Sequence, residues 1–174
     1  MALPKKYTTF VYVFSKTELE KLLLYRLGLD YKINIRPGLK LPFGLVYNLS
    51  KKELYYLREY LNKIEKLGFI RKLTSKVALL IMFVAKKDSD LRPIVDFRAI
   101  NAIIVPNRYP ILLISEILNR LNNTEIFTKL DLRGAYNLIR VKEGYKYLIA
   151  FRTRHGLYEY LVMPFGLYNA LVIF

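Results

Sequence analysis

Residues 126–136 read IFTKLDLRGAY, and this stretch decides the fold. Its first part, Ile126–Asp131, is rich in apolar and β-branched side chains, which predicts a strand that ends on a carboxylate. Gly134 follows where a turn is expected. A carboxylate beside a glycine turn suits Mg²⁺, because a hard cation takes oxygen ligands. An aspartate at a strand end is also a common turn or cap residue, so the spacing alone leaves both interpretations open.

A β-hairpin is expected before this stretch. Ala78–Lys86 predicts a buried strand and Leu91–Phe97 a second one, joined by a polar turn at residues 87–90. Pro93 lacks the N–H group that a ladder needs, so the second strand is expected at the edge of its sheet.

Cations gather near the tip of this hairpin. Lys86, Lys87 and Arg92 could surround a triphosphate, with Arg92 binding through its guanidinium fork. A solvated turn is the alternative, in which Asp88 and Asp90 are turn formers that offset the lysines.

The remaining elements of the second half are predicted from periodicity. Helical spacing is present over Ile111–Leu121, and a further helix begins near the last residues. Short strands are expected over Leu138–Val141, Tyr147–Phe151 and Tyr158–Met163. His155 lies in a predicted hairpin turn, where an exposed turn residue is its simplest role.

The first half predicts two helices. A Ser-x-x-Glu capping box begins at Ser15 and another at Ser50, each ahead of leucines at helical spacing. Each pattern ends on a glycine, Gly28 or Gly68. Residues 36–48 hold two prolines and two glycines and predict an extended linker.

Composition narrows the classes of function. In the 174 residues, 29 Lys and Arg outnumber 14 Asp and Glu, for a net charge of +15, and residues 1–72 carry 15 and 6 of these. This excess predicts a polyanionic partner, with nucleic acid as the first candidate and an anionic membrane as the second. The alternative is that the lysine count reflects drift in genomic base composition.

The near absence of metal-binding side chains excludes further classes of site. Without Cys and with one His, the chain lacks the ligands for zinc clusters and multi-His sites, and only His155 could serve a Ser-His-Asp triad. No apolar run reaches the roughly 20 residues of a membrane helix and no signal peptide is present, so an intracellular location, cytoplasm or nucleus, is expected.

Five motifs then occur in order along the chain. They are DFRAIN at residues 96–101, NRYP at 107–110, FTKLDLRGAY at 127–136, AFRT at 150–153 and VMPFGL at 162–167. This series resembles the reverse transcriptase of long-terminal-repeat retrotransposons, the gypsy-like (metavirus) class of polyproteins. Residues 42–54 resemble the segment that leads into that polymerase.

The resemblance implies a fold and its domains. The fold class is α+β: the fingers and part of the palm of a right-hand polymerase, with an incomplete ferredoxin-like palm. Residues 1–67 would be the helical, basic segment leading into the polymerase. Residues 68–174 would be the fingers and the first part of the palm, ending before the second catalytic Asp motif.

The resemblance also implies the site. Asp131 matches the first catalytic carboxylate, which with the carbonyl of Leu132 would bind two Mg²⁺ ions. Residues that match the dNTP-binding set are Lys86, Lys87, Arg92, Tyr136, Phe165 and Gly166. An aromatic such as Tyr136 is, on pattern alone, more often a core residue. The implied partners are an RNA or DNA template with its primer, dNTP and other parts of a retroelement polyprotein, without a membrane.

This chain alone is expected to be inactive, because the adjacent Asp pair of the family is missing. After Asp131 its only acidic residues are Glu143 and Glu159, and neither lies in such a motif. Missing strands would also leave Tyr147–Phe151 and Tyr158–Met163 uncovered, which predicts poor solubility.

Two alternatives stay open. The first is a basic nucleic-acid-binding remnant without chemistry. The second is a non-functional relic decayed by C-to-T mutation, since Leu80 and Leu171 stand where the family usually has proline, and Ile149 and Ile173 where it has threonine.

Overall fold

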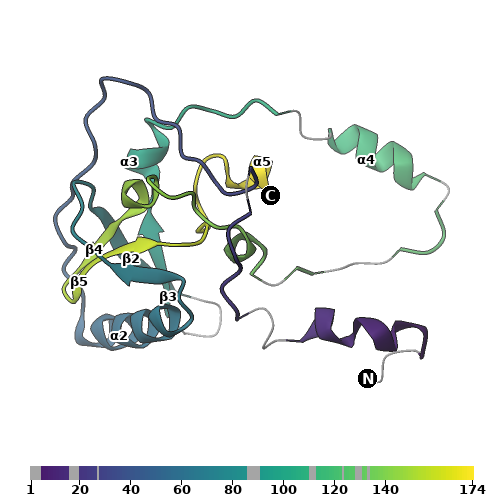
Figure 1. Ribbon diagram of the computed structural model, residues 1–174, viewed down its shortest axis with the longest axis horizontal. Helices are drawn as coiled ribbons and strands as arrows, with labels where there is room; N and C mark the ends of the chain where they lie inside the picture. Colours follow the sequence, from purple (N-terminus) through teal and green to yellow (C-terminus); the bar gives the residue numbers. More distant parts are fainter. Residues whose placement is uncertain are drawn as a thin grey trace.

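The computed structural model describes residues 5–15, 20–26, 28–85, 91–109, 113–122, 124–127, 131–132 and 134–174. The strands are β1 (Ile70–Lys72), β2 (Leu79–Ala85), β3 (Leu91–Asp96), β4 (Phe151–Thr153) and β5 (Gly156–Tyr160). The α-helices are α2 (Lys51–Lys66), α3 (Arg98–Asn101), α4 (Ile114–Leu121) and α5 (Ala170–Ile173). Three 3₁₀ helices complete the set: η1 (Lys5–Phe14), η2 (Ala135–Leu138) and η3 (Lys146–Ile149). Figure 1 shows α2 along one side of the sheet and α4 standing away from it.

One mixed sheet organises the folded body, in the order β1-β5-β4-β2-β3. The predicted hairpin is confirmed: β2 and β3 pair antiparallel from Leu80↔Asp96 to Ala85↔Leu91. Strand β3, which contains Pro93, lies at the edge as predicted. Strand β2 pairs parallel to β4, and β4 forms a second hairpin with β5 in which His155 occupies the exposed turn, also as predicted.

Helix α2 begins and ends as the sequence predicts. Ser50 accepts a hydrogen bond from the backbone N–H of Glu53, and the Glu53 carboxylate accepts one from the Ser50 N–H. At the other end Gly68 has φ +72°, so its N–H reaches the carbonyl of Glu65 while the Phe69 N–H reaches that of Ile64. Only glycine adopts this conformation without strain, which explains the stop.

The helix predicted between Ser15 and Gly28 is wrong for its described residues 20–26, which form no helix. Their polar groups bind the body of the chain instead. The Leu23 carbonyl accepts a hydrogen bond from the Arg140 guanidinium at 2.8 Å, and Arg26 donates to the Leu138 carbonyl at 2.9 Å. The η1 helix, which the sequence did not predict, precedes this segment. Residues 36–48 contain no helix or strand, as expected of a linker, apart from an isolated bridge at Phe43.

The strand predicted over Tyr147–Phe151 is wrong, because η3 occupies Lys146–Ile149 and β4 begins only at Phe151. A left-handed Gly144 (φ +81°) lies in the turn of residues 143–145, directly before this helix. The strand predicted over Leu138–Val141 is reduced to two isolated bridges, Arg140 with Val162 and Val141 with Tyr31.

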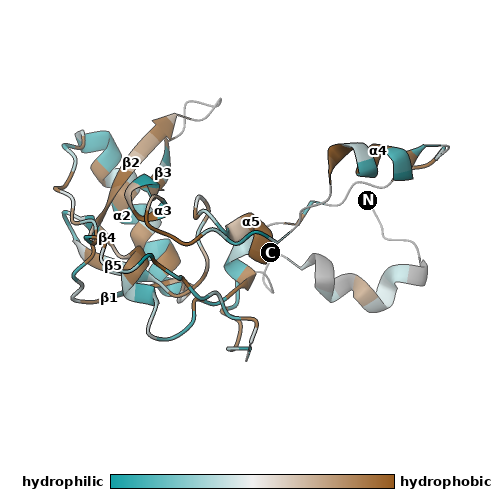
Figure 2. Ribbon diagram, turned by 90° about the horizontal axis from the view of Figure 1, so that it is seen from above, coloured by the Kyte–Doolittle hydropathy of each residue, from teal (hydrophilic) through white to brown (hydrophobic). Residues whose placement is uncertain are grey.

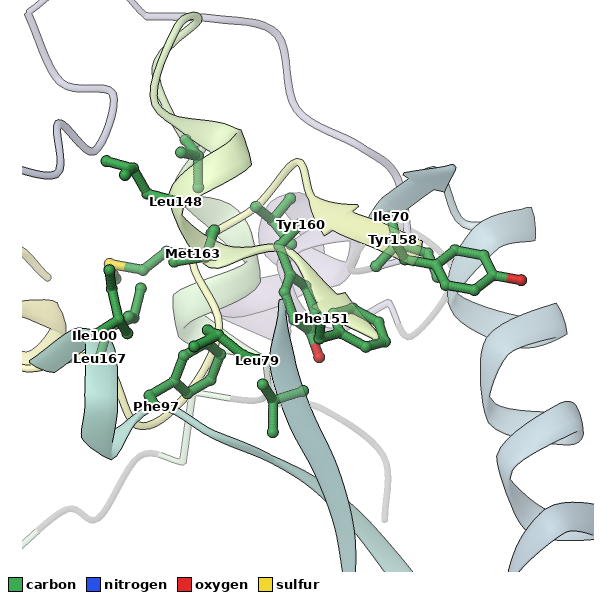
Figure 3. Close-up of a cluster of buried hydrophobic side chains, with 14 of the residues drawn as sticks. Ile70, Leu79, Phe97, Ile100, Leu148, Phe151, Tyr158, Tyr160, Met163 and Leu167 are labelled. Carbon is green, nitrogen blue, oxygen red and sulfur yellow. The ribbon is translucent and has the colours of Figure 1, made fainter. Parts of the chain in front are cut away.

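Most side chains of the two faces that were expected to be uncovered are buried, although Tyr147 is 38% exposed. Phe151 is 0% exposed, Tyr158 3% and Met163 0%. Figure 3 shows how side chains from the sheet and the turns after it converge around Phe151. Tyr31 and Leu57 join the same core. The core therefore takes residues from both sides of the boundary predicted at residues 67–68, and that boundary stays a prediction.

Helix α4 and the segment after it expose many of their apolar side chains. Helix α4 confirms the helical periodicity there, but none of its residues is buried. Ile126 is 85% exposed and Phe127 63% exposed, and the described residues of the expected strand Ile126–Asp131 form no strand. Figures 1 and 2 agree that α4 stands apart from the sheet. Among the described helices, none has the length and apolarity to cross a membrane.

Candidate nucleotide and nucleic-acid site

A groove of about 630 Å³ opens beside the edge strand β3. Its walls come from β3, from one side of α2, and from the turn at residues 164–166. The lining of the groove includes Tyr60, Arg92, Asp96, Arg98, Asn101, Phe165 and Gly166. Strand β3 lies at the edge of the sheet, and five of its six residues line the groove.

Three of the predicted dNTP-binding residues meet at this groove. Arg92, Phe165 and Gly166 all line it, although Arg92 is more than 70 positions away from the other two in the sequence. Lys86 and Lys87 lie outside the described residues.

Tyr136 is not part of the lining of the groove, but its ring packs against Phe165, which is. The two rings meet edge-on with centroids 4.6 Å apart, and Phe174 lies 5.6 Å from Tyr136 on another side. Gly166 next to Phe165 has φ +93°, and a Cβ there would lie 3.3 Å from the Phe97 ring. The positive φ favours glycine here, and the Phe97 ring leaves little room for a side chain.

Asp131 and Leu132 do not belong to this lining. Both are exposed, and Leu132 is 64% exposed. Within the described part of the chain, no three His, Cys, Asp or Glu residues come together as a metal site. The donor set of the described residues therefore does not fit a two-metal centre, because two divalent ions need several carboxylates.

Comparison with known proteins decides the family. Residues 84–174 match the family described as reverse transcriptase (RNA-dependent DNA polymerase). The chain belongs to the reverse transcriptase family. Over 169 residues it is 37% identical to the Transposon Tf2-3 polyprotein of Schizosaccharomyces pombe, a region that is 97% of this chain and 13% of that polyprotein. It is equally similar to the Tf2-7 polyprotein of the same yeast over 166 residues, which are 12% of that polyprotein.

The fold agrees with this assignment. A crystal structure of the Prototype Foamy Virus protease–reverse transcriptase matches with a TM-score of 0.74 and 19% sequence identity, covering 98% of this chain and 24% of the viral chain. The predicted α+β fold of a partial polymerase is thereby confirmed. This reverse transcriptase chain spans a small part of the length of its curated relatives, 13% for Tf2-3.

The sequence motifs indicated no role for the carboxylate of Asp96 in this reverse transcriptase. Arg98 donates from Nε at 2.9 Å and from a terminal nitrogen at 2.7 Å, and its backbone N–H donates at 3.0 Å. These hydrogen bonds from Arg98 hold the pKa of Asp96 below its ordinary value. Both residues line the groove, and the motif DFRAIN was the only signal of this pair in the sequence.

Asp96→Asn should lower the free energy of unfolding by up to about 1 kcal/mol at neutral pH, since its partner is well exposed. The folded pKa of Asp96 is lowered, so its contribution is fully present above the unfolded value of about 3.9 and is lost as pH falls through the folded value. Urea unfolding at pH values from 7 to 3 should show that the free energies of unfolding of the parent and of Asp96→Asn become more similar as the pH falls. Glu116→Gln, in the exposed α4, is the control and should show no such convergence.

Two asparagines fasten the 165–170 turn to the segment after β3. Asn101 donates to the Gly166 carbonyl at 2.8 Å and accepts from the Tyr168 N–H at 2.9 Å. Asn169 donates to the Val105 carbonyl and accepts from the Asn107 N–H, both at 2.9 Å. Asn101 belongs to the DFRAIN motif, whereas nothing in the sequence pointed to Asn169. Together they hold Phe165 and Gly166 at the groove.

Proposed function

We propose that this chain is the fingers and first palm segment of a reverse transcriptase of a gypsy-like retroelement, extending a primer with dNTPs as part of a larger polyprotein. The observation that carries the proposal is the convergence of Arg92, Phe165 and Gly166 on one groove, within residues 84–174 that match the family. The ordered motifs and the similarity to transposon polyproteins support the retroelement class.

The groove chemistry suits a nucleoside triphosphate. Arg92 offers a planar guanidinium with several donors for phosphate oxygens. Phe165 presents an aromatic surface, backed by the Tyr136 ring, against which a sugar or base can pack. Lys86 and Lys87, which follow β2 directly, are proposed as additional phosphate ligands.

Asp131 and the Leu132 carbonyl are proposed as ligands of Mg²⁺ in the whole domain. Their exposure leaves them accessible to further carboxylates from other parts of a polyprotein. The described residues supply no complete site, so the 174-residue chain by itself is proposed to be inactive. An intracellular location, cytoplasm or nucleus, is part of the proposal because the substrates are nucleic acid and dNTP.

A chimera tests this function. The chain replaces its matching 169-residue region in the Tf2-3 polyprotein, and primer extension on an RNA template is measured with Mg²⁺. Extension is expected for the chimera and not for the 174-residue chain alone. Asp131→Asn should reduce extension by the chimera to background, whereas Glu125→Gln, a nearby exposed carboxylate, should leave it unchanged.

Two results would contradict the proposal. If the chimera still extends the primer when it carries Asp131→Asn, the Asp131 carboxylate is not part of the catalytic site. A chimera that folds but never extends a primer would favour the alternative of a binding remnant without chemistry.

A further inference from the structure

Helix α2 exposes a basic and aromatic stripe on the side away from the core. The α2 stripe consists of Lys51, Tyr55, Arg58, Asn62 and Lys66, and all five residues are exposed. Steps of four and three residues place them within an arc of about 80° on an α-helix, along a length of about 22 Å. The buried residues of α2 are Leu57, Leu61 and Ile64, on the other side of the helix.

The cations of the α2 stripe are not neutralised by the fold. Within the described residues, Lys51, Arg58 and Lys66 form no ion pair. Of the three glutamates of the helix, Glu53 is held in the capping box, and Glu59 and Glu65 flank the stripe on either side without an ion pair to its cations within the described residues. A row of unpaired cations repels itself, so it lowers its energy when a polyanion lies along it.

The stripe is separate from the groove. Tyr60 and Ile64 are the residues of α2 that line the groove, and helical geometry places them across the helix from Tyr55 and Arg58. A strand bound along the stripe would therefore not occupy the nucleotide groove.

We propose that the α2 stripe binds a single nucleic-acid strand, with Lys51, Arg58 and Lys66 on phosphates and Tyr55 stacked on one base. Tyr55 is 65% exposed, and an exposed ring among cations is the arrangement that single strands use, because an unpaired base offers its face. A membrane surface fits less well, since the apolar face that an interfacial helix would insert is buried in the core.

The test measures binding of the 174-residue chain to a labelled strand of about 20 nucleotides by fluorescence anisotropy. The variant K51Q/R58Q/K66Q keeps good helix formers and removes three charges. The matched control R36Q/K40Q/K76Q removes three exposed charges from elsewhere on the chain. Urea unfolding midpoints confirm that each variant folds as the parent does.

The stripe variant should reduce the slope of log K against log salt by about 2, at about 0.7 for each lost phosphate contact, and should weaken binding at least about tenfold at 0.1 M salt. Tyr55→Ala should weaken binding about tenfold while leaving the slope unchanged, because stacking releases no counterions. The control should change affinity less than about threefold.

Three results would each overturn the proposal. They are equal losses of affinity in the two triple variants, unchanged affinity in Tyr55→Ala, and absence of strand binding by the parent. Binding to anionic phospholipid vesicles that needs the stripe, without strand binding, would also overturn it. This test is independent of the chimera test. The binding experiment requires no primer extension, and primer extension on a short template is not expected to require the α2 stripe.

Discussion

Phe151→Ala is expected to remove about 3–5 kcal/mol from the free energy of unfolding. Phe151 begins β4 and is 0% exposed, with the Tyr158 ring stacked at 5.8 Å and the Tyr160 ring at 5.0 Å. Truncation leaves a cavity between two strands that the neighbouring rings fill only in part. A domain of this kind has about 5–15 kcal/mol in total, so much of the stability would be lost.

Urea unfolding measures this effect as a lower midpoint at an unchanged slope. Phe127→Ala is the matched control, because Phe127 is 63% exposed and should change the free energy of unfolding by less than about 0.5 kcal/mol. Similar losses in both variants would mean that Phe151 is not at the centre of the core.

Arg71→Ala is the second change with a large expected effect, about 2–3 kcal/mol. Arg71 and Glu159 are paired across β1 and β5, and the Arg71 Nε donates to a Glu159 carboxylate oxygen at 2.6 Å. The Glu159 side chain is 3% exposed, whereas that of Arg71 is 54% exposed. Removing Arg71 therefore leaves a buried negative charge without its partner, and burial of an unpaired charge is costly.

The reverse change should be milder. Glu159→Gln removes the buried charge, and the half-exposed Arg71 can turn to water, so about 1–2 kcal/mol is expected. The double variant R71A/E159Q should be more stable than Arg71→Ala alone, which urea unfolding of the four proteins measures as a coupling energy. Additive losses would show that Arg71 acts through packing of its side chain and not through its charge.

Local patterns predicted the elements whose hydrogen bonds are local. The Ser50 capping box and Gly68 define α2 because their partners lie within four residues in the chain. The β2–β3 hairpin needed only two apolar runs, a polar turn and the edge position that Pro93 requires.

Elements with distant partners were predicted wrongly. Residues 20–26 have helical spacing, yet Leu23 and Arg26 bind Arg140 and Leu138, more than 100 residues away. Tyr25 strengthens this attachment, since its ring lies 4.0 Å from the Arg140 guanidinium and its hydroxyl donates to Glu143 at 2.7 Å. No pattern within ten residues encodes such contacts.

Some residues of the candidate site could be predicted from motifs, and others could be found only in the structure. The motifs identified Arg92, Tyr136, Phe165 and Gly166, and the structure brings three of these to one groove and packs Tyr136 on Phe165. The roles of Asn101 and Asn169 as fasteners of that turn were not predicted, because an asparagine has no periodicity that reveals its partner.

By itself, the sequence determined the family, the caps of α2, the edge position of β3 and a strongly basic surface, since ordered motifs, local hydrogen bonds and charge are properties of the chain. Only the tertiary structure showed that residues 147–149 belong to η3. It also showed that Phe151 and Tyr158 are buried, whereas Ile126 and Phe127 are exposed. The physical reason is that apolar runs of similar composition can pack in several ways, and burial depends on which distant segment arrives to cover them. The stretch IFTKLDLRGAY illustrates both: its motif identifies the polymerase, whereas its described residues Ile126 and Phe127 form no strand and are exposed.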